Sequence, residues 1–359
     1  MTLYRLVPHG RTRASALEAL AGDLALALRV EDVLVQQLPQ EGCVGVFVPR
    51  TSSASEPLLW RDLFGSIASR AGSHGVVIPL LLGTDWLGVS RVDDLTTLPH
   101  LLVAGSTGSG KSVFMRSILA TIVYSMNNCD CELVLSDTKG VEFTDFVGCK
   151  HLRYGEAATT PLRTVEQMDL LCNETDRRLC LIGSKGARNI KEYNKALGDQ
   201  LGTKLPYIIL AIDELADIVD LPSEKGKARR IGAEKLDYLT RKARAAGIHV
   251  IASTQRPSVD VVKGVIKSNF MARICFRVPS AVDSRVVLDE VGAEHLLKQG
   301  DMLYKSPNFP GLQRLHSGLA TSLDISGALR YASYQQADSQ NQAGQARLSQ
   351  GAPNQGRIQ

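Results

Sequence analysis

Short apolar runs alternate with longer amphipathic stretches over most of this chain, from about residue 97 to residue 330. The apolar runs are rich in Val, Ile and Leu, which is the pattern of strands buried on both faces. Such runs span residues 101–104, 131–136, 207–212, 248–253 and 273–278, with helical patterns between them that include 162–182 and 231–246. The alternation predicts an α/β fold with a mostly parallel sheet covered by helices on both sides.

Residues 1–96 have a different pattern, which predicts a small α+β domain in front of the larger one. Apolar runs at 33–38 and 44–48 are expected to pair as a hairpin, and further strands are expected at 76–82 and 87–91. The preceding helix is predicted from a capping box at Ser15 and Glu18 and from Leu17, Leu20, Leu24 and Leu28, which recur on one face. Residues 331–359 are rich in Gln, Asn, Ser and Gly, so a disordered tail is expected there.

Bulk composition narrows the class of partner only slightly. The net charge of +4 and the pI near 8.6 permit an anionic partner without requiring one. Aromatic residues make up 5% of the chain, which argues against broad base-stacking surfaces. No secretory signal is recognised, and no run reaches the roughly 18 apolar residues that cross a bilayer. We therefore expect a protein with reduced thiols that is cytoplasmic, or that is held at a membrane only through a partner.

A phosphate-binding loop follows the first strand of the larger domain. The segment fits G-x-x-x-x-G-K-[ST], and it stands between a strand and a helical run, which is the context that this motif requires. Glycines let backbone N–H groups turn toward phosphate oxygens, and the helix N-terminus favours negative charge. The lysine is expected to reach the β- and γ-phosphates of ATP, and the serine to bind Mg²⁺. The expected nucleotide contacts are Gly105, Ser106, Thr107, Gly108, Ser109, Gly110, Lys111, Ser112 and Val113.

Candidate catalytic groups follow two later strands. Asp213 ends a wholly apolar run, so it is expected beside the same Mg²⁺, and Glu214 is expected to polarise the attacking water. Gln255 follows the strand at 248–253 and is expected to sense the γ-phosphate. Arg256 and Arg285 are both candidates for an arginine that a neighbouring subunit supplies, and sequence does not choose between them.

The chain resembles the motor region of the FtsK/SpoIIIE family of DNA translocases over about residues 97–318. Beyond the loop and the Asp213-Glu214 pair, the resemblance rests on the segments 99–105, 187–194, 205–217, 241–249, 254–260, 283–285 and 300–304. A fainter likeness at residues 14–50 implies that 1–96 is part of the small α domain of that family. The likeness also implies that 97–330 is a RecA-like ATPase domain that assembles into a ring, expected to be hexameric.

In that family the ring moves along double-stranded DNA with ATP as fuel, and loops of the motor domain touch the DNA backbone. The matching residues here are Lys263 and Lys267, with Arg229 and Arg230 on a second loop. Such cations would contact phosphates without reading sequence.

The chain departs from the family pattern in three ways, and two other functions stay open. Asp137-Thr138-Lys139 replaces the usual Asp-Pro-Lys, and neither a membrane anchor nor a winged-helix module is recognised. Membrane anchoring and sequence-directed polarity are therefore not expected to carry over. A related ATPase that moves or recruits protein in secretion or conjugation is the first alternative. A nucleotide-dependent scaffold is the second, and the intact Lys111, Asp213 and Glu214 disfavour it.

Overall fold

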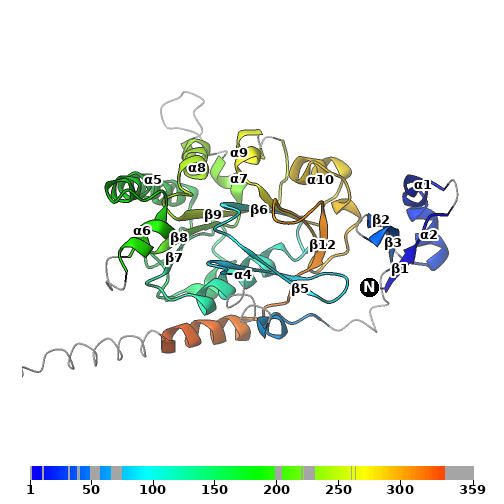
Figure 1. The fold of residues 1–359 in the computed structure, drawn as a ribbon, viewed down its shortest axis with the longest axis horizontal. Helices are drawn as coiled ribbons and strands as arrows, with labels where there is room; N and C mark the ends of the chain where they lie inside the picture. The colour runs from blue at the N-terminus through cyan, green and yellow to red at the C-terminus, as the bar shows by residue number, and fades with distance from the viewer. Residues whose placement is uncertain are drawn as a thin grey trace, which may run out of the picture.

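A twisted sheet forms the centre of the molecule, and the order of its strands brings the loops of the candidate site to one edge. The structure, a computed structural model, describes residues 2–9, 12–30, 33–38, 41–48, 57–65, 75–198, 204–219, 221, 231–259, 261, 262 and 264–335. Within these residues nine strands pair in the order β5 (Ser90–Asp94), β4 (Pro79–Thr84), β12 (Gln313–His316), β11 (Asp301–Lys305), β10 (Ala272–Phe276), β6 (His100–Ala104), β9 (Ile248–Thr254), β8 (Tyr207–Ile212) and β7 (Cys131–Ser136) (Figure 1). The five strands from β10 to β7 are parallel, and the other pairs are antiparallel.

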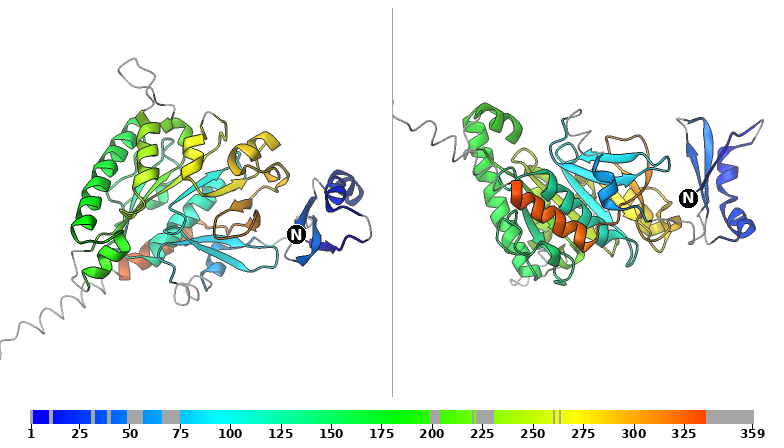
Figure 2. Two further views of the ribbon diagram at one scale, coloured as in Figure 1. Left: turned by 45° about the horizontal axis from the view of Figure 1, so that its top comes forward. Right: turned by 90° about the horizontal axis from the view of Figure 1, so that it is seen from below.

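Helices cover both faces of this sheet, as the sequence predicts. One face carries α4 (Lys111–Ser125) and a helix at residues 322–335, which lie side by side (Figure 2). The other face carries α5 (Pro161–Ser184), α7 (Leu215–Val219), α8 (Ile231–Lys242) and α10 (Ala281–Leu288). The remaining helices are α6 (Ile190–Ala196), α9 (Gly264–Asn269), and the 3-10 turns η3 (Trp60–Leu63), η4 (Thr144–Phe146) and η5 (Ala293–His295).

The buried strands show why both faces need cover. In β6, Leu101 and Val103 pack into the core on the α4 face, whereas Leu102 and Ala104 pack into the core on the opposite face. Successive side chains of a strand point to opposite sides, so a wholly apolar run is stable only between two apolar layers. The strands at 131–136 and 207–212 have the bounds that the sequence predicts.

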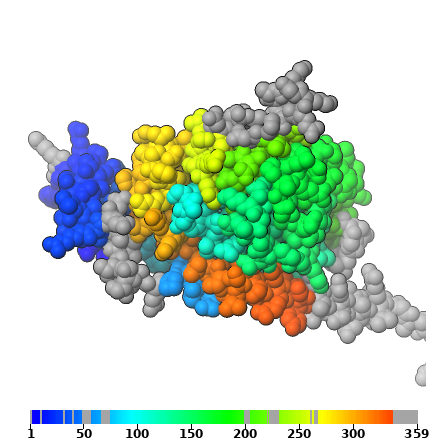
Figure 3. Space-filling model, turned by 180° about the vertical axis from the view of Figure 1, so that it is seen from behind, coloured from blue at the N-terminus to red at the C-terminus, as the bar shows by residue number. Residues whose placement is uncertain are grey.

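The N-terminal residues form a separate three-stranded sheet, in the order β1 (Thr2–Leu6), β3 (Cys43–Val48) and β2 (Leu34–Leu38). The β2–β3 hairpin is confirmed as an antiparallel pair. The short helices α1 (Ala14–Glu18) and α2 (Ala21–Leu28) pack on one face of this sheet. The unit is a distinct lobe at one end of the molecule (Figure 3).

Three expectations for residues 1–96 differ from the structure. The capping box is wrong, because Arg13 is the N-cap of α1 and makes no side-chain cap bond. The chain also turns at residues 19 and 20, so Leu17 and Leu24 reach the small core while Leu20 and Leu28 are exposed. Strands β4 and β5, grouped with the small domain from the sequence, lie at the edge of the large sheet because β4 pairs with β12.

The structure adds two findings on redox state and membrane crossing. All seven cysteines lie among the described residues, and each is a free thiol. No helix in the described part of the chain combines the length and the apolar character that crossing a bilayer requires. Most of the segment expected to be a disordered tail, from residue 336 onward, lies outside the described residues, and 331–335 are helical.

Candidate nucleotide site

The predicted phosphate-binding loop joins β6 to the first turn of α4. Gly110 is the N-cap of that helix, with a φ of 109°, and Gly108 has a φ of 76°. Both values lie in the region that glycine adopts at little cost. The loop therefore directs backbone N–H groups and the helix N-terminus toward the same point, as an anion site requires.

Neighbouring backbone holds this loop rigidly. The Ser106 N–H and hydroxyl both donate to the Arg277 carbonyl, each at 2.9 Å. The Gly300 N–H donates to the Ser109 carbonyl at 3.0 Å. A Cβ on Gly110 would lie 2.6 Å from the Gly300 nitrogen, so only glycine fits where these two segments cross.

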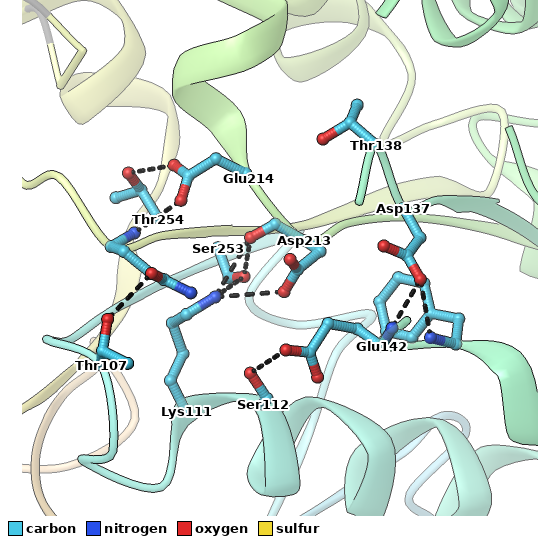
Figure 4. Close-up of polar contacts among 12 residues, drawn as sticks. Thr107, Lys111, Ser112, Asp137, Thr138, Glu142, Asp213, Glu214, Ser253 and Thr254 are labelled. Atoms are coloured by element: carbon cyan, nitrogen blue, oxygen red, sulfur yellow. Dashed lines mark hydrogen bonds and ion pairs between the residues drawn. The ribbon is translucent and has the colours of Figure 1, made fainter. Parts of the chain in front are cut away.

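Lys111 and Asp213 meet beneath the loop, as the sequence predicts (Figure 4). The lysine Nζ lies 3.1 Å from Asp213 Oδ1 and 2.8 Å from Ser253 Oγ. The two charged side chains are 3% and 1% exposed. The carboxyl ends of β6, β8 and β9 stand together at this edge, which brings residues over 100 positions apart into one cluster.

The oxygen ligands at this edge suit Mg²⁺. Asp213 Oδ2 is buried and has no hydrogen-bond partner, and Ser109 Oγ is likewise buried without one. Such groups are costly unless a ligand completes them. The Ser112 hydroxyl donates to Glu142 Oε1 at 2.9 Å, which adds a second carboxylate. Two carboxylates and a hydroxyl are too few for an all-protein cage, but they fit a magnesium ion shared with phosphate oxygens.

Glu142 is a site residue that the sequence analysis missed. Asp137, at the end of β7, holds the turn that carries it by accepting N–H groups from Gly140, Glu142 and Phe143. Thr138, where the family usually has proline, donates its hydroxyl to Asp217 at 2.6 Å. A carboxylate five residues after a strand-end aspartate was the available signal, and its pairing with Ser112 depends on tertiary structure.

The structure places Glu214 beside the end of β9. Its Oε1 accepts the Thr254 hydroxyl at 2.7 Å, and its Oε2 accepts the Gln255 N–H at 3.0 Å. The Gln255 side chain reaches the phosphate-binding loop, where its Oε1 accepts the Thr107 hydroxyl at 3.1 Å. The polar residue expected near the γ-phosphate therefore contacts the loop directly, and Thr254 is an additional residue of the site.

The structure brings the remaining candidates less close together. Arg256 follows Gln255 directly and is exposed, whereas Arg285 is exposed on α10. Lys267 on α9 pairs with Asp289 at 2.6 Å, so its charge is already partly matched. The other three cations proposed to contact DNA, Lys263, Arg229 and Arg230, lie outside the described residues.

Comparisons with known proteins found relatives over most of the chain. The model of the FtsK/SpoIIIE family matches residues 73–259. A DNA translocase FtsK of Campylobacter jejuni is 36% identical over 326 residues, which are 90% of this chain and 33% of that protein. A DNA translocase FtsK of Treponema pallidum is 37% identical over 311 residues, 86% of this chain and 38% of that protein. The chain thus spans between a third and two fifths of the length of these two relatives.

Solved structures identify the fold. The pCW3 conjugation coupling protein TcpA, in its monomer form with ATPγS, is 25% identical, with a TM-score of 0.65 over 89% of this chain and 86% of that one. The cytoplasmic domain of the Thermomonospora curvata type VII secretion ATPase EccC is 24% identical, with a TM-score of 0.62 over 71% of this chain and 31% of that one. The fold is that of the RecA-like P-loop ATPases, preceded by a small α+β unit.

Proposed function

This chain belongs to the FtsK/SpoIIIE family, and we propose that it is the motor part of an ATPase that moves along double-stranded DNA. The observation that carries the proposal is the cluster of Lys111, Asp213 and Ser253 beneath a glycine-rich loop at the helix N-terminus. That cluster matches a triphosphate with its metal ion. The curated relatives that resemble the chain over most of its length are DNA translocases, which favours duplex DNA as the track.

The residues divide the work of hydrolysis between them. The N–H groups of the loop from Gly105 to Val113 hold the phosphates, and Lys111 places its charge against the β- and γ-phosphates. Ser112 and Asp213 would hold Mg²⁺, which would neutralise charge on the phosphate oxygens. Glu214 takes a proton from the attacking water, and Gln255 contacts the γ-phosphate from β9.

A ring of copies, expected to be hexameric, completes the proposal. Hydrolysis in such motors usually requires an arginine from a neighbouring subunit, and Arg256 and Arg285 are exposed and available for this role. Lys263, Lys267, Arg229 and Arg230 are proposed to contact DNA phosphates without reading sequence. A motor with ATP and DNA as substrates acts in the cytoplasm, and we place this one there.

The decisive experiment measures ATP hydrolysis with and without linear duplex DNA at several salt concentrations. We expect duplex DNA to raise the rate at low salt and this effect to fall steeply as salt increases, because phosphate contacts release counterions. Displacement of a third strand from duplex DNA then tests for movement, with Lys111→Ala as the inactive control. Hydrolysis that does not respond to DNA, but rises with a peptide substrate, would favour the secretion or conjugation alternative.

Ring formation has a separate test. Sedimentation of the chain with ATPγS and duplex DNA should show a species of about six copies that is absent without nucleotide. A chain that remains monomeric while DNA stimulates hydrolysis would contradict the ring and leave the ATPase assignment standing.

A further inference from the structure

The Glu214 carboxylate is turned toward the end of β9 and is tied there by hydrogen bonds. Both oxygens of Glu214 accept hydrogen bonds, from the Thr254 hydroxyl at 2.7 Å and from the Gln255 N–H at 3.0 Å, and Oε1 also faces the Ala216 N–H at 3.3 Å. The side chain is buried. These bonds fix the direction of the carboxylate toward β9, whereas a general base must lie within hydrogen-bond reach of the water whose proton it removes.

Asp213, the preceding residue, presents a contrast. Its Oδ2 is buried and has no partner, so it is free for a metal ion. Figure 4 shows Asp213 directed toward Lys111, while Glu214 extends away toward Thr254. Asp213 therefore keeps one oxygen free for the metal ion, whereas Glu214, the group proposed to activate water, is directed toward β9.

Thr254 connects this carboxylate to two other parts of the motor. Its hydroxyl donates to Glu214 and accepts the Arg256 N–H at 3.0 Å. Its carbonyl accepts the Gly105 N–H at 3.3 Å, at the start of the phosphate-binding loop. A shift of the backbone at Arg256 would therefore disturb the bond that holds Glu214, while the carbonyl keeps its own partner on the loop.

The chain after β9 is placed to receive such a shift. Arg256, Ser258 and Val259 are exposed, in contrast to the fully buried strand that they follow. These residues lead from β9 toward α9, which carries Lys267, one of the cations proposed to contact DNA. A DNA phosphate that binds the exposed Arg256 side chain would therefore shift the backbone next to the buried hydrogen bond between Thr254 and Glu214.

We propose that Thr254 is a positioning residue that holds Glu214 away from the γ-phosphate until DNA contacts the segment after β9. The inference rests on the proposed DNA-dependent ATPase and adds how DNA controls it. In the resting subunit, ATP and Mg²⁺ bind but water is not activated. Displacement of Arg256 frees the Thr254 hydroxyl and the Gln255 N–H from Glu214, and the carboxylate then turns toward the nucleotide.

The test compares ATP hydrolysis by the full chain and by Thr254→Val, with and without linear duplex DNA at low salt. Valine has the shape of threonine but cannot donate to the carboxylate. We expect the rate without DNA to rise about tenfold, which corresponds to one hydrogen bond to a charged group. The maximal rate with DNA should stay within about twofold, so the stimulation ratio falls. Thr254→Ser retains the hydroxyl and should restore the ratio.

A matched control removes another buried threonine hydroxyl. Thr175 on α5 is fully buried and donates to the Leu171 carbonyl, far along the chain from the site. Thr175→Val should leave both rates and their ratio unchanged. If the rates of Thr254→Val with and without DNA fall together, or if its ratio matches the wild type, the proposed holding role is overturned. If the wild type itself does not respond to DNA, the proposed function fails first.

Hydrogen exchange in the wild type gives a measurement that needs no variant. With ATPγS bound, duplex DNA should speed exchange of the Gln255 and Arg256 amides, which the resting contacts protect. The Gly105 amide, bonded to the Thr254 carbonyl, should stay protected. Equal or slower exchange at Gln255 and Arg256 with saturating DNA would overturn the inference even if every variant were inactive.

Discussion

At the scale of single residues, the Glu142 carboxylate adds a negative charge beside the expected metal ion. Its Oε1 accepts the Ser112 hydroxyl, one of the groups proposed to bind Mg²⁺. Glu142→Gln keeps an acceptor for that hydroxyl but removes a negative charge. We predict that about tenfold more Mg²⁺ is needed for half-maximal stabilisation by ATPγS, since residues that support metal ligands typically contribute this much. The measurement is the thermal unfolding midpoint with ATPγS as Mg²⁺ is titrated.

The control for this prediction is Glu166→Gln. Glu166 pairs with Arg163 on the exposed surface of α5, so the same change of charge occurs away from the site. It should leave the Mg²⁺ requirement unchanged. An equal requirement in Glu142→Gln and the wild type would mean that Glu142 only positions the turn after β7.

At the scale of elements, two neighbouring strands each carry a buried histidine side chain. His100 on β6 accepts the Val250 N–H at Nδ1 and faces the Thr240 carbonyl with Nε2, both at 3.0 Å. Only the neutral ring with a proton on Nε2 makes both bonds. Burial, and then the nearby His249, lower the pKa of His100 to about 3, and burial lowers the pKa of His249 on β9 to about 4.

These shifts predict a loss of stability on mild acidification. The unfolded chain binds protons on both rings below pH 6.5, whereas the folded chain does not until the pH nears 4. The free energy of unfolding therefore has its full value above pH 6.5. It falls by about 2 kcal/mol for each imidazole as the pH is lowered to about 5. Denaturant titrations at the two pH values measure the loss. His100→Asn, whose amide oxygen can accept the Val250 N–H, should halve the pH dependence, and an unchanged slope would contradict this origin.

The second prediction at the scale of elements concerns the close contact between Gly110 and Gly300. Gly110→Ala adds the strain of a positive φ, about 1–2 kcal/mol, and drives a Cβ to within 2.6 Å of the Gly300 nitrogen. The loop must open, so we predict at least about tenfold weaker binding of ATPγS by calorimetry. Gly186→Ala is the control, because Gly186 has a φ of 67° with open space around it. Comparable affinity in the two variants would show that Gly300 does not support the loop.

Sequence patterns predicted the elements well and their partners poorly. The strands at 131–136 and 207–212 are short apolar runs with polar ends, so their bounds were visible. The sequence did not predict the sheet to which β4 belongs. Its partner β12 lies more than 200 residues away, and the sequence of one strand does not specify which strand pairs with it. The proximity of Lys111 and Asp213 was predictable, because the carboxyl ends of neighbouring parallel strands meet at one edge of a sheet. Glu142 and Thr254 were missed because their roles come from contacts that only folding creates.

At the scale of the whole molecule, aromatic and cationic side chains among the described residues join the N-terminal unit to the large domain. Phe47 on β3 points away from the valine core of its own sheet and lies against Trp86 of the β4–β5 turn, with 6.4 Å between ring centroids. The Arg314 guanidinium lies 5.6 Å from the same ring. Arg314 forms a buried bidentate pair with Asp301, next to Gly300 at the phosphate-binding loop. The strand pair β11–β12 thus supports both the contact with Phe47 and the backbone beside the phosphate-binding loop.

Removal of the Phe47 ring should separate the unfolding of the two units. Among the described residues, Ala, Val and Leu side chains form the core of the N-terminal unit, and a unit of this size buries little apolar surface, so contacts at the junction are expected to add to its stability. Phe47→Ala is expected to cost about 3–5 kcal/mol, because it removes a buried ring and leaves a cavity. Calorimetry should then resolve an early transition of the N-terminal unit from a later one that ATPγS still raises. Tyr4→Ala, which changes an exposed ring on β1 of the same sheet, should unfold as the wild type does. A single transition in Phe47→Ala would mean that the two units are coupled by contacts other than this ring.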